Sequence, residues 1–151
     1  MVSLTHMVRA PVVQSRTAWL SAVLFASCIA SGCGNSRSSE GRIPMGAVDV
    51  PRSGQALSGH FSAVGWAVSE DRIKGVSVFL DRSLLKDCSI GGSRPDVSKV
   101  YPGFPEGDNA GWTVDLDAGS LPEGKHELVF QAESAKGARR DLGTVTVIIM
   151  H

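Results

Sequence analysis

The side chains that could hold a metal ion are densest between residues 106 and 117. They are Glu106, Asp108, Asn109, Asp115 and Asp117. Calcium takes about six to eight oxygen ligands, which loops of surface domains can supply. The spacing here lacks the regular pattern of a calcium loop, and Asp and Asn are ordinary residues of a glycine-rich turn. We therefore interpret the segment as turn structure and expect no metal or other cofactor.

Histidine chemistry also finds little support in the sequence. Three histidines follow the N-terminal region, His60, His126 and His151, and none has a metal-ligand spacing from another histidine or a cysteine. His126 opens a predicted strand, where we expect it to pack or to make a hydrogen bond. No nucleophile elbow or comparable motif brings Ser, His and Asp together. The sequence therefore predicts no catalytic residues, and we expect a protein that is not an enzyme.

Three aromatic residues could form a platform for sugars: Trp66, Tyr101 and Trp112. Aromatic rings offer large apolar faces, and those of Trp and Tyr carry a polar group as well. Trp66 lies in a β-rich stretch, and Trp112 is in phase with Val114 and Leu116, so we expect both in the core. Tyr101 is the freest of the three. A small carbohydrate-binding module is therefore the alternative to the function favoured below.

The longest excursion between the main predicted strands spans residues 82–110, includes the possible strand 84–90, and contains Arg94 and Asp96. Long ordered connections are either functional or braced. We expect Arg94 to be a brace that pairs with a carboxylate or with loop carbonyls, so that a helical turn covers one end of the domain. The alternative is ligand capture, with an envelope protein or polysaccharide as partner. The side chains that would form this partner surface are Arg94, Asp96, Tyr101, Asp108 and Asn109.

The N-terminal region predicts export. Residues 1–32 contain Arg9 and Arg16 but no acidic residue and no lysine, and they include the apolar stretch Ala18–Ala30. A basic start, an apolar run and small residues after it are typical of a secretory signal. At 13 residues the run is shorter than the ~20 that a membrane-spanning helix needs.

The residues Ala30-Ser31-Gly32-Cys33 resemble the lipobox of bacterial lipoproteins, although leucine usually stands in the place of Ala30. The resemblance implies that Cys33 receives a diacylglyceryl group and becomes the amino terminus after cleavage. Triacylated lipoproteins carry several acyl chains, palmitate among them, which implies durable membrane attachment. The alternative is an ordinary signal peptide that is cleaved nearby, with Cys33 left as a free thiol.

The other cysteines fit this interpretation. Cys28 would leave with the signal and Cys33 would carry the lipid, so Cys88 has no partner for an intramolecular disulfide. Cys88 is either a reactive thiol or a small apolar side chain, and we expect it to be mostly buried.

Charge argues against nucleic acid as a partner. Without residues 1–32 the chain has 13 basic and 15 acidic residues, a formal charge of −2. Nucleic-acid binding needs positive charge clustered on one face. The group that comes nearest, Lys136, Arg139 and Arg140, lies in a predicted turn.

Residues 33–46 are rich in Gly, Ser and charge and are expected to be a flexible tether to a domain over residues 47–151. Apolar alternation predicts an all-β, immunoglobulin-like antiparallel β-sandwich of about seven strands. In the second strand the apolar face changes near Gly65, which predicts a bulge or bend there. Pro95 favours one or two helical turns, closed by Pro102. The expected strands cover residues 47–50, 57–68, 73–81, 84–90, 111–117, 125–133 and 142–150.

Four short motifs occur in a familiar order: GWA at Gly65–Ala67, RPDV at Arg94–Val97, GW at Gly111–Trp112 and LPEGKH at Leu121–His126. Together they resemble an immunoglobulin-like module of exported and surface-associated bacterial proteins, across most of residues 50–149. The resemblance implies a β-sandwich and a surface setting, and it transfers no catalytic residue. We therefore expect a lipid-anchored protein of the bacterial cell envelope, facing the periplasm or the exterior, with a role in recognition or structure.

Overall fold

The computed structural model describes residues 41–151, so the predicted signal and Cys33 lie outside the described residues. The described part is mostly β, with eight strands where about seven were expected. The strands are β1 (Met45–Val50), β2 (Gln55–Leu57), β3 (His60–Val68), β4 (Ile73–Leu80), β5 (Ser83–Gly92), β6 (Gly111–Asp117), β7 (Gly124–Ser134) and β8 (Arg139–Ile149). Helix α1 covers Pro95–Val100, and two short 3₁₀ turns follow, η1 (Gly107–Asn109) and η2 (Ala118–Ser120).

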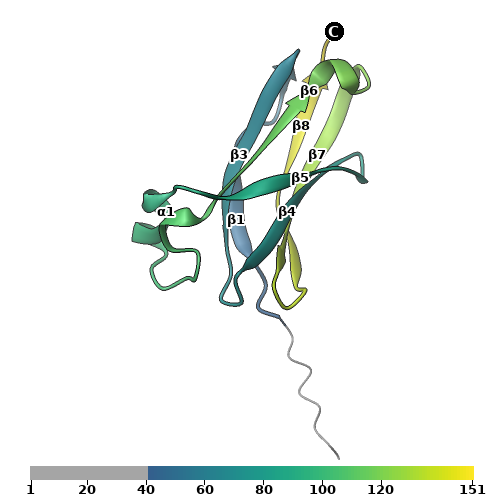
Figure 1. The fold of residues 1–151 in the computed structure, drawn as a ribbon. Coiled ribbons are helices and arrows are strands. Elements are labelled where there is room, and N and C mark those ends of the chain that lie inside the picture. Colours follow the sequence, from purple (N-terminus) through teal and green to yellow (C-terminus); the bar gives the residue numbers. More distant parts are fainter. Residues whose placement is uncertain (1–40) are drawn as a thin grey trace, which may run out of the picture. The chain divides into compact units, whose positions relative to one another are not determined.

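The strands form one sheet in the order β1-β3-β6-β5-β4-β7-β8-β2. Strand β5 joins its two halves, because Ser83–Cys88 pair with β4 whereas Ser89–Gly92 pair with β6. Figure 1 shows β5 crossing between the two groups of strands. Most pairs are antiparallel, and the exception is β2, which runs parallel to β8.

The main core lies between the inner faces of the two halves. Trp112 on β6 stacks on Phe130 on β7, with ring centroids 5.0 Å apart, and both side chains are buried. The alternation predicted for β4, β6 and β7 is confirmed, since Val76, Val114 and Leu128 are buried on this face. Burying side chains of this size is the dominant favourable term in folding.

The second predicted strand, residues 57–68, is two strands in the structure. Leu57 ends β2, which pairs with β8, and His60 begins β3, which pairs with β1 and β6. Gly59 between them has φ +57, a left-handed conformation that glycine adopts readily. The chain therefore changes from one half of the sheet to the other at this glycine.

The bulge or bend predicted at Gly65 is found beside it, on the neighbouring strand: β3 pairs with β6 in unbroken register from His60 to Trp66, but the β1–β3 pairing shifts between Val48 and Val50, opposite Gly65 and Val64. Gly65 itself is needed for close packing. A Cβ atom there would lie 2.2 Å from the carbonyl oxygen of Ala47 and 2.3 Å from Cζ2 of Trp112. The apparent change of apolar face arose because Trp66 is apolar but belongs to the outer face.

Trp66 is consequently not in the main core, which corrects the expectation. It is half-buried and packs in a second, smaller cluster with Val68, Val97 and Ala110. This cluster lies between the outer face of β3 and the segment 93–110, which contains α1 and η1. The predicted helical turn at Pro95 is confirmed, and Figure 1 shows it projecting to one side of the sheet.

The N-terminal end of the described chain is attached to the sheet before the predicted domain start at residue 47. Strand β1 begins at Met45, and Pro44 is buried. The Arg42 amide donates to Asp71 and its carbonyl accepts a hydrogen bond from the Ser69 hydroxyl at 3.2 Å. Residues 41–46, placed in the tether by the sequence, therefore pack against the turn between β3 and β4.

Candidate functional site

The connection from β5 to β6, residues 93–110, is the candidate site, and Arg94 fixes its first turn. The Arg94 guanidinium donates from Nε and Nη2 to the two carboxylate oxygens of Asp96, at 2.9 and 2.8 Å. Its Nη1 donates to Asp49 on β1 at 2.6 Å. The predicted brace is thus confirmed, and two carboxylates rather than loop carbonyls are its partners.

The Arg94 brace also shifts the pKa values of Arg94 and Asp96. Hydrogen bonds from Arg94 lower the pKa of Asp96 to about 2, and the paired carboxylates raise the pKa of Arg94. Arg94 and Asp96 therefore stay charged at any physiological pH. Bidentate pairs of this kind fix geometry as well as contributing energy.

Asp108 joins η1 to α1 and so makes one unit of the connection. Its carboxylate accepts a hydrogen bond from the Ser98 hydroxyl on α1, and its carbonyl accepts one from the Arg94 amide at 2.5 Å. Tyr101, at the end of α1, stacks on Trp66 with ring centroids 5.1 Å apart. It keeps 37% of its surface exposed, the expected behaviour for the freest of the three aromatic residues.

Glu106 clamps the connection to the turn between β3 and β4. Its two carboxylate oxygens accept hydrogen bonds from the backbone amides of Ile73, at 2.6 Å, and Ser69, at 3.3 Å. Sequence reasoning placed Glu106 in an acidic group and missed this role, because the amides that it binds lie more than thirty residues away in the chain.

A cavity of about 250 Å³ lies beside this clamp, between the connection and the sheet. Buried apolar residues line its floor, among them Ala67, Val76 and Trp112. Arg72, Glu106 and Asn109 lie along it as polar residues. Of the residues predicted to form a partner surface, Asn109 lines the cavity. Arg94, Asp96 and Asp108 instead make the hydrogen bonds that brace the connection.

The acidic residues considered for calcium do not come together. Asp115 accepts a hydrogen bond from Ser62 on the neighbouring strand at 2.5 Å, and Asp117 accepts one from the Gly119 amide at 3.0 Å. Both are on β6, away from the Glu106 clamp. In the described residues 41–151, no three His, Cys, Asp or Glu side chains are grouped closely enough to hold a metal ion.

The two side chains that could act as a base or a nucleophile are His126 and Cys88. His126 has a structural partner, and Cys88 is a thiol of low reactivity. His126 Nδ1 lies 2.6 Å from a carboxylate oxygen of Asp81, and this contact raises the pKa of His126 and lowers that of Asp81. The same carboxylate accepts from the Glu127 amide at 2.9 Å, so the pair fastens the end of β4 to β7. Burial, more than the neighbouring Asp87, raises the pKa of Cys88 to about 12, which leaves it a neutral thiol.

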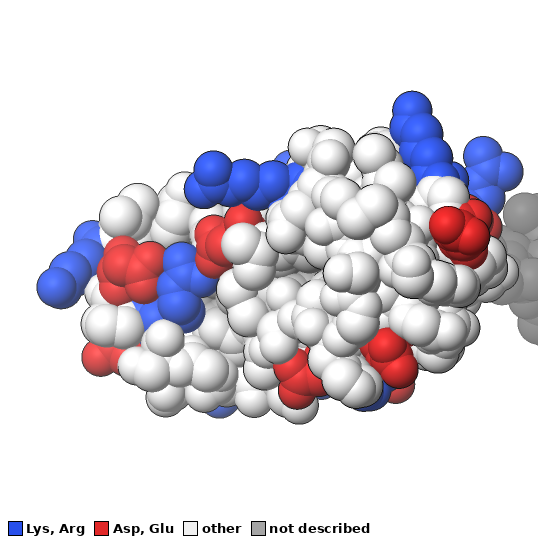
Figure 2. Space-filling model, turned by 90° about the horizontal axis from the view of Figure 1, so that it is seen from above, with Lys and Arg blue, Asp and Glu red and all other residues white. Residues whose placement is uncertain are grey.

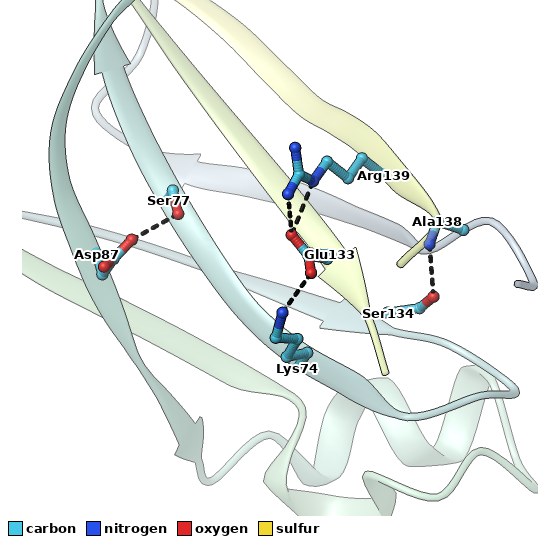
Figure 3. A network of polar contacts seen from close by, with 7 residues as sticks. All are labelled: Lys74, Ser77, Asp87, Glu133, Ser134, Ala138 and Arg139. Carbon is cyan, nitrogen blue, oxygen red and sulfur yellow. Dashed lines mark hydrogen bonds and ion pairs between the residues drawn. The ribbon is translucent and has the colours of Figure 1, made fainter. Parts of the chain in front are cut away.

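The outer face of β4, β7 and β8 carries an ion-pair network around Glu133 (Figure 3). Glu133 lies between Lys74, at 2.6 Å, and Arg139, at 2.7 Å, and these cations lower its pKa. A hydrogen bond of 2.6 Å joins Ser77 to Asp87 beside it. Exposed networks of this kind fix cross-strand register and contribute little to stability. Figure 2 shows charges of both signs interspersed among uncharged areas on the face that it displays.

Comparison with known proteins finds likenesses among solved structures, and two weak ones are to bacterial proteins. No family model matches the chain, and no curated protein matches it. Fibronectin(III)-like modules of Clostridium thermocellum CbhA share 14% identity at a TM-score of 0.49, over 72% of this chain. The endo-beta-1,4-mannanase of Thermotoga petrophila shares 13% identity at a TM-score of 0.48, over 73% of this chain.

The chain spans 47% of the first of these proteins and 20% of the second. Likenesses at this level carry no inference about function. Across residues 41–151, none of the helices has the length and apolar character needed to cross a bilayer.

Proposed function

We propose that this chain is a bacterial envelope lipoprotein whose immunoglobulin-like β-sandwich serves in recognition or structure rather than in catalysis. The anchor would be lipid on Cys33, which follows the apolar run Ala18–Ala30 in a lipobox-like context. The domain would face the periplasm or the exterior.

The strand order supports the immunoglobulin-like part of the proposal. One half of the sheet contains β1, β3 and β6, and the other contains β4, β7 and β8. The first strand of the domain is divided between them, since β1 pairs antiparallel with β3 and β2 pairs parallel with β8. Antiparallel halves that enclose a core between their inner faces are the arrangement of β-sandwich domains.

The observation that carries the recognition role is the preorganised connection 93–110. The Arg94 brace and the Glu106 clamp fix it at both ends, and Asp108 joins its two short helices. A surface that is rigid before binding loses less conformational freedom when a partner binds. A rigid projection beside a sheet is therefore a suitable binding element.

A capture experiment on envelope extracts tests this role, with the full chain as bait. A partner of the connection should be retained by the wild-type chain and by Arg140→Gln, and lost with Arg94→Gln, which releases Asp49 and Asp96. Arg140 is the matched control because it is an exposed arginine on β8. Equal retention by all three chains would contradict a partner site on this connection.

A carbohydrate-binding module is the second candidate, and the exposed ring of Tyr101 stacked on Trp66 favours it. Sugar rings pack on exposed aromatic faces of this kind. Titration with cell-wall polysaccharides should then change the tryptophan fluorescence of the wild-type chain but not of Tyr101→Ala. An unchanged wild-type signal across the series would rule against sugar binding at this pair.

A further inference from the structure

The cavity beside the Glu106 clamp has the dimensions of a site for a small ligand. Its volume of about 250 Å³ equals the liquid volume of about eight water molecules. Binding pockets for drug-sized molecules start near ~300 Å³. The space suits a single ring or a short branched chain, and it is too small for an oligosaccharide.

An apolar ligand body would complete the packing of this cavity. Ala67, Val76 and Trp112 on its floor are buried residues of the core. Ile90 at its rim is a large apolar side chain with 46% of its surface exposed. A ring or branched chain in the cavity would cover Ile90 and remove further apolar surface from water.

The polar groups along the cavity favour an anion at its mouth. Within residues 41–151, the side chains of Arg72 and Asn109 take part in no hydrogen bond or ion pair. The Glu106 carboxylate already accepts two backbone amides, so its charge is partly compensated. A guanidinium and an amide N–H are donors that suit a carboxylate.

The backbone around Arg72 gives no local reason for an arginine. Its φ of 67° lies in the left-handed region, where glycine is most readily accommodated and asparagine is favoured over most other residues. The lining of the cavity includes another irregular position, Gly91, which is the extra residue of a bulge between Ile90 and Gly92. Bulges leave backbone groups outside the ladder and occur often beside binding sites.

Trp112 adds an unsatisfied donor to this region. Its side chain is 2% exposed, and its indole Nε1–H has no hydrogen-bond partner among residues 41–151. Buried donors usually have a partner, which an ordered water can supply, and the indole N–H serves here as an NMR reporter of the cavity floor.

From these groups we propose that the cavity binds a small apolar carboxylate, with its ring or branched chain on the floor at Trp112 and Val76. The carboxylate lies at the mouth, where Arg72 and Asn109 donate hydrogen bonds to it. This site gives the recognition role proposed above a ligand class, and it does not depend on lipid at Cys33.

A pair of matched probes tests the proposal: phenylacetate and its neutral analogue phenylacetamide. The full chain is labelled with ¹⁵N, kept in solution with an uncharged detergent and titrated with each probe by NMR. Phenylacetate should shift the Gly91 amide and the Trp112 indole signals and bind at least tenfold more tightly than phenylacetamide. The indole signal is assigned with Trp112→Phe.

Variants at exposed positions locate the two parts of the site without disturbing the core. Arg72→Gln should remove the tenfold preference for the acid, and Arg140→Gln should retain it. Ile90→Ser should weaken both probes to a similar extent, because it removes apolar contact alone. Equal affinity of the two probes, or a preference that survives Arg72→Gln, would overturn the proposal.

Absence of saturable shifts at Gly91 and Trp112 would overturn it as well. That result would leave the lipid anchor and the role of the Arg94-braced surface standing, since other experiments test them.

Discussion

Replacing Gly65 by alanine should destabilise the domain more than an ordinary glycine substitution, because backbone packs against this position on one side and an indole ring on the other. The new Cβ would lie 2.2 Å from the carbonyl oxygen of Ala47 and 2.3 Å from Cζ2 of Trp112. The carbonyl belongs to β1, which is paired with β3, and the indole is stacked on Phe130. Neither atom is the free end of a flexible side chain, so the strands or the ring must move.

The expected cost follows from this overlap. Extra methylenes in a packed core typically cost about 1–3 kcal/mol, occasionally more. Because both contacts at Gly65 are far below a normal separation and one is to backbone, we expect about 3 kcal/mol. That is a large share of the ~5–15 kcal/mol that stabilises a domain. The midpoint of thermal unfolding should fall by roughly 10 °C.

Urea denaturation monitored by tryptophan fluorescence measures the effect, and Gly75→Ala is the matched control. Gly75 is also in a strand, and a Cβ there would meet nothing within 4 Å. Alanine at this open position should be neutral or stabilise by up to ~1 kcal/mol, since glycine is unfavourable inside strands. If Gly65→Ala and Gly75→Ala unfold at the same urea concentration, the packing of Trp112 described here is wrong.

Three further predictions concern charge and reactivity. Arg94→Gln should speed amide hydrogen exchange across residues 95–110 while changing global stability by no more than ~1 kcal/mol, because exposed ion pairs contribute little; unchanged exchange would refute the brace. The His126–Asp81 pair should stabilise the fold most between the ordinary pKa values of 3.8 and 6.5. The raised pKa of His126 contributes stability that is complete below pH 6.5 and is lost as the pH rises through the pKa of His126 in the folded state. The lowered pKa of Asp81 contributes stability that is complete above pH 3.8 and is lost as the pH falls through the pKa of Asp81 in the folded state. Urea unfolding at pH 5.5 and pH 8 should therefore show a larger loss on raising the pH for wild type than for His126→Asn, and equal losses would contradict the pairing. Cys88, with its pKa raised to about 12, should react with a thiol reagent at pH 8 far more slowly in the folded than in the urea-unfolded chain, and equal rates would contradict its burial.

Local patterns predicted the regular strands well. Alternation of apolar residues located β4, β6 and β7 and their buried faces, since period-two patterns reflect one-sided packing directly. Pro95 likewise marked the start of α1. These features depend on neighbouring residues and can be read from a short stretch of sequence.

Features that depend on distant contacts were harder to predict. Trp66 and Trp112 have similar local settings, but α1 covers the first on the outer face and the second fills the core. The packing role of Gly65 could not be predicted, because it is set by Trp112, a residue on another strand.

In the candidate site, too, contacts between neighbouring residues could be predicted and contacts between distant residues could not. The pairing of Arg94 with a carboxylate could be anticipated from its place beside Asp96, but Asp49 as its second partner could not. Arg72 and Gly91 escaped notice because the cavity forms only when the connection 93–110 packs against the sheet. The Gly91-Gly92 pair directly after the predicted strand 84–90 is the signal in the sequence that could have indicated the bulge.

The lipid anchor is the central functional claim, and the mass of the N-terminal peptide tests it most directly. The protein is extracted from bacterial membranes, digested and analysed by mass spectrometry. We predict a peptide that begins at Cys33 and carries a diacylglyceryl group with a further acyl chain. A peptide in which Cys33 is an unmodified thiol, or an amino terminus elsewhere in the chain, would contradict it.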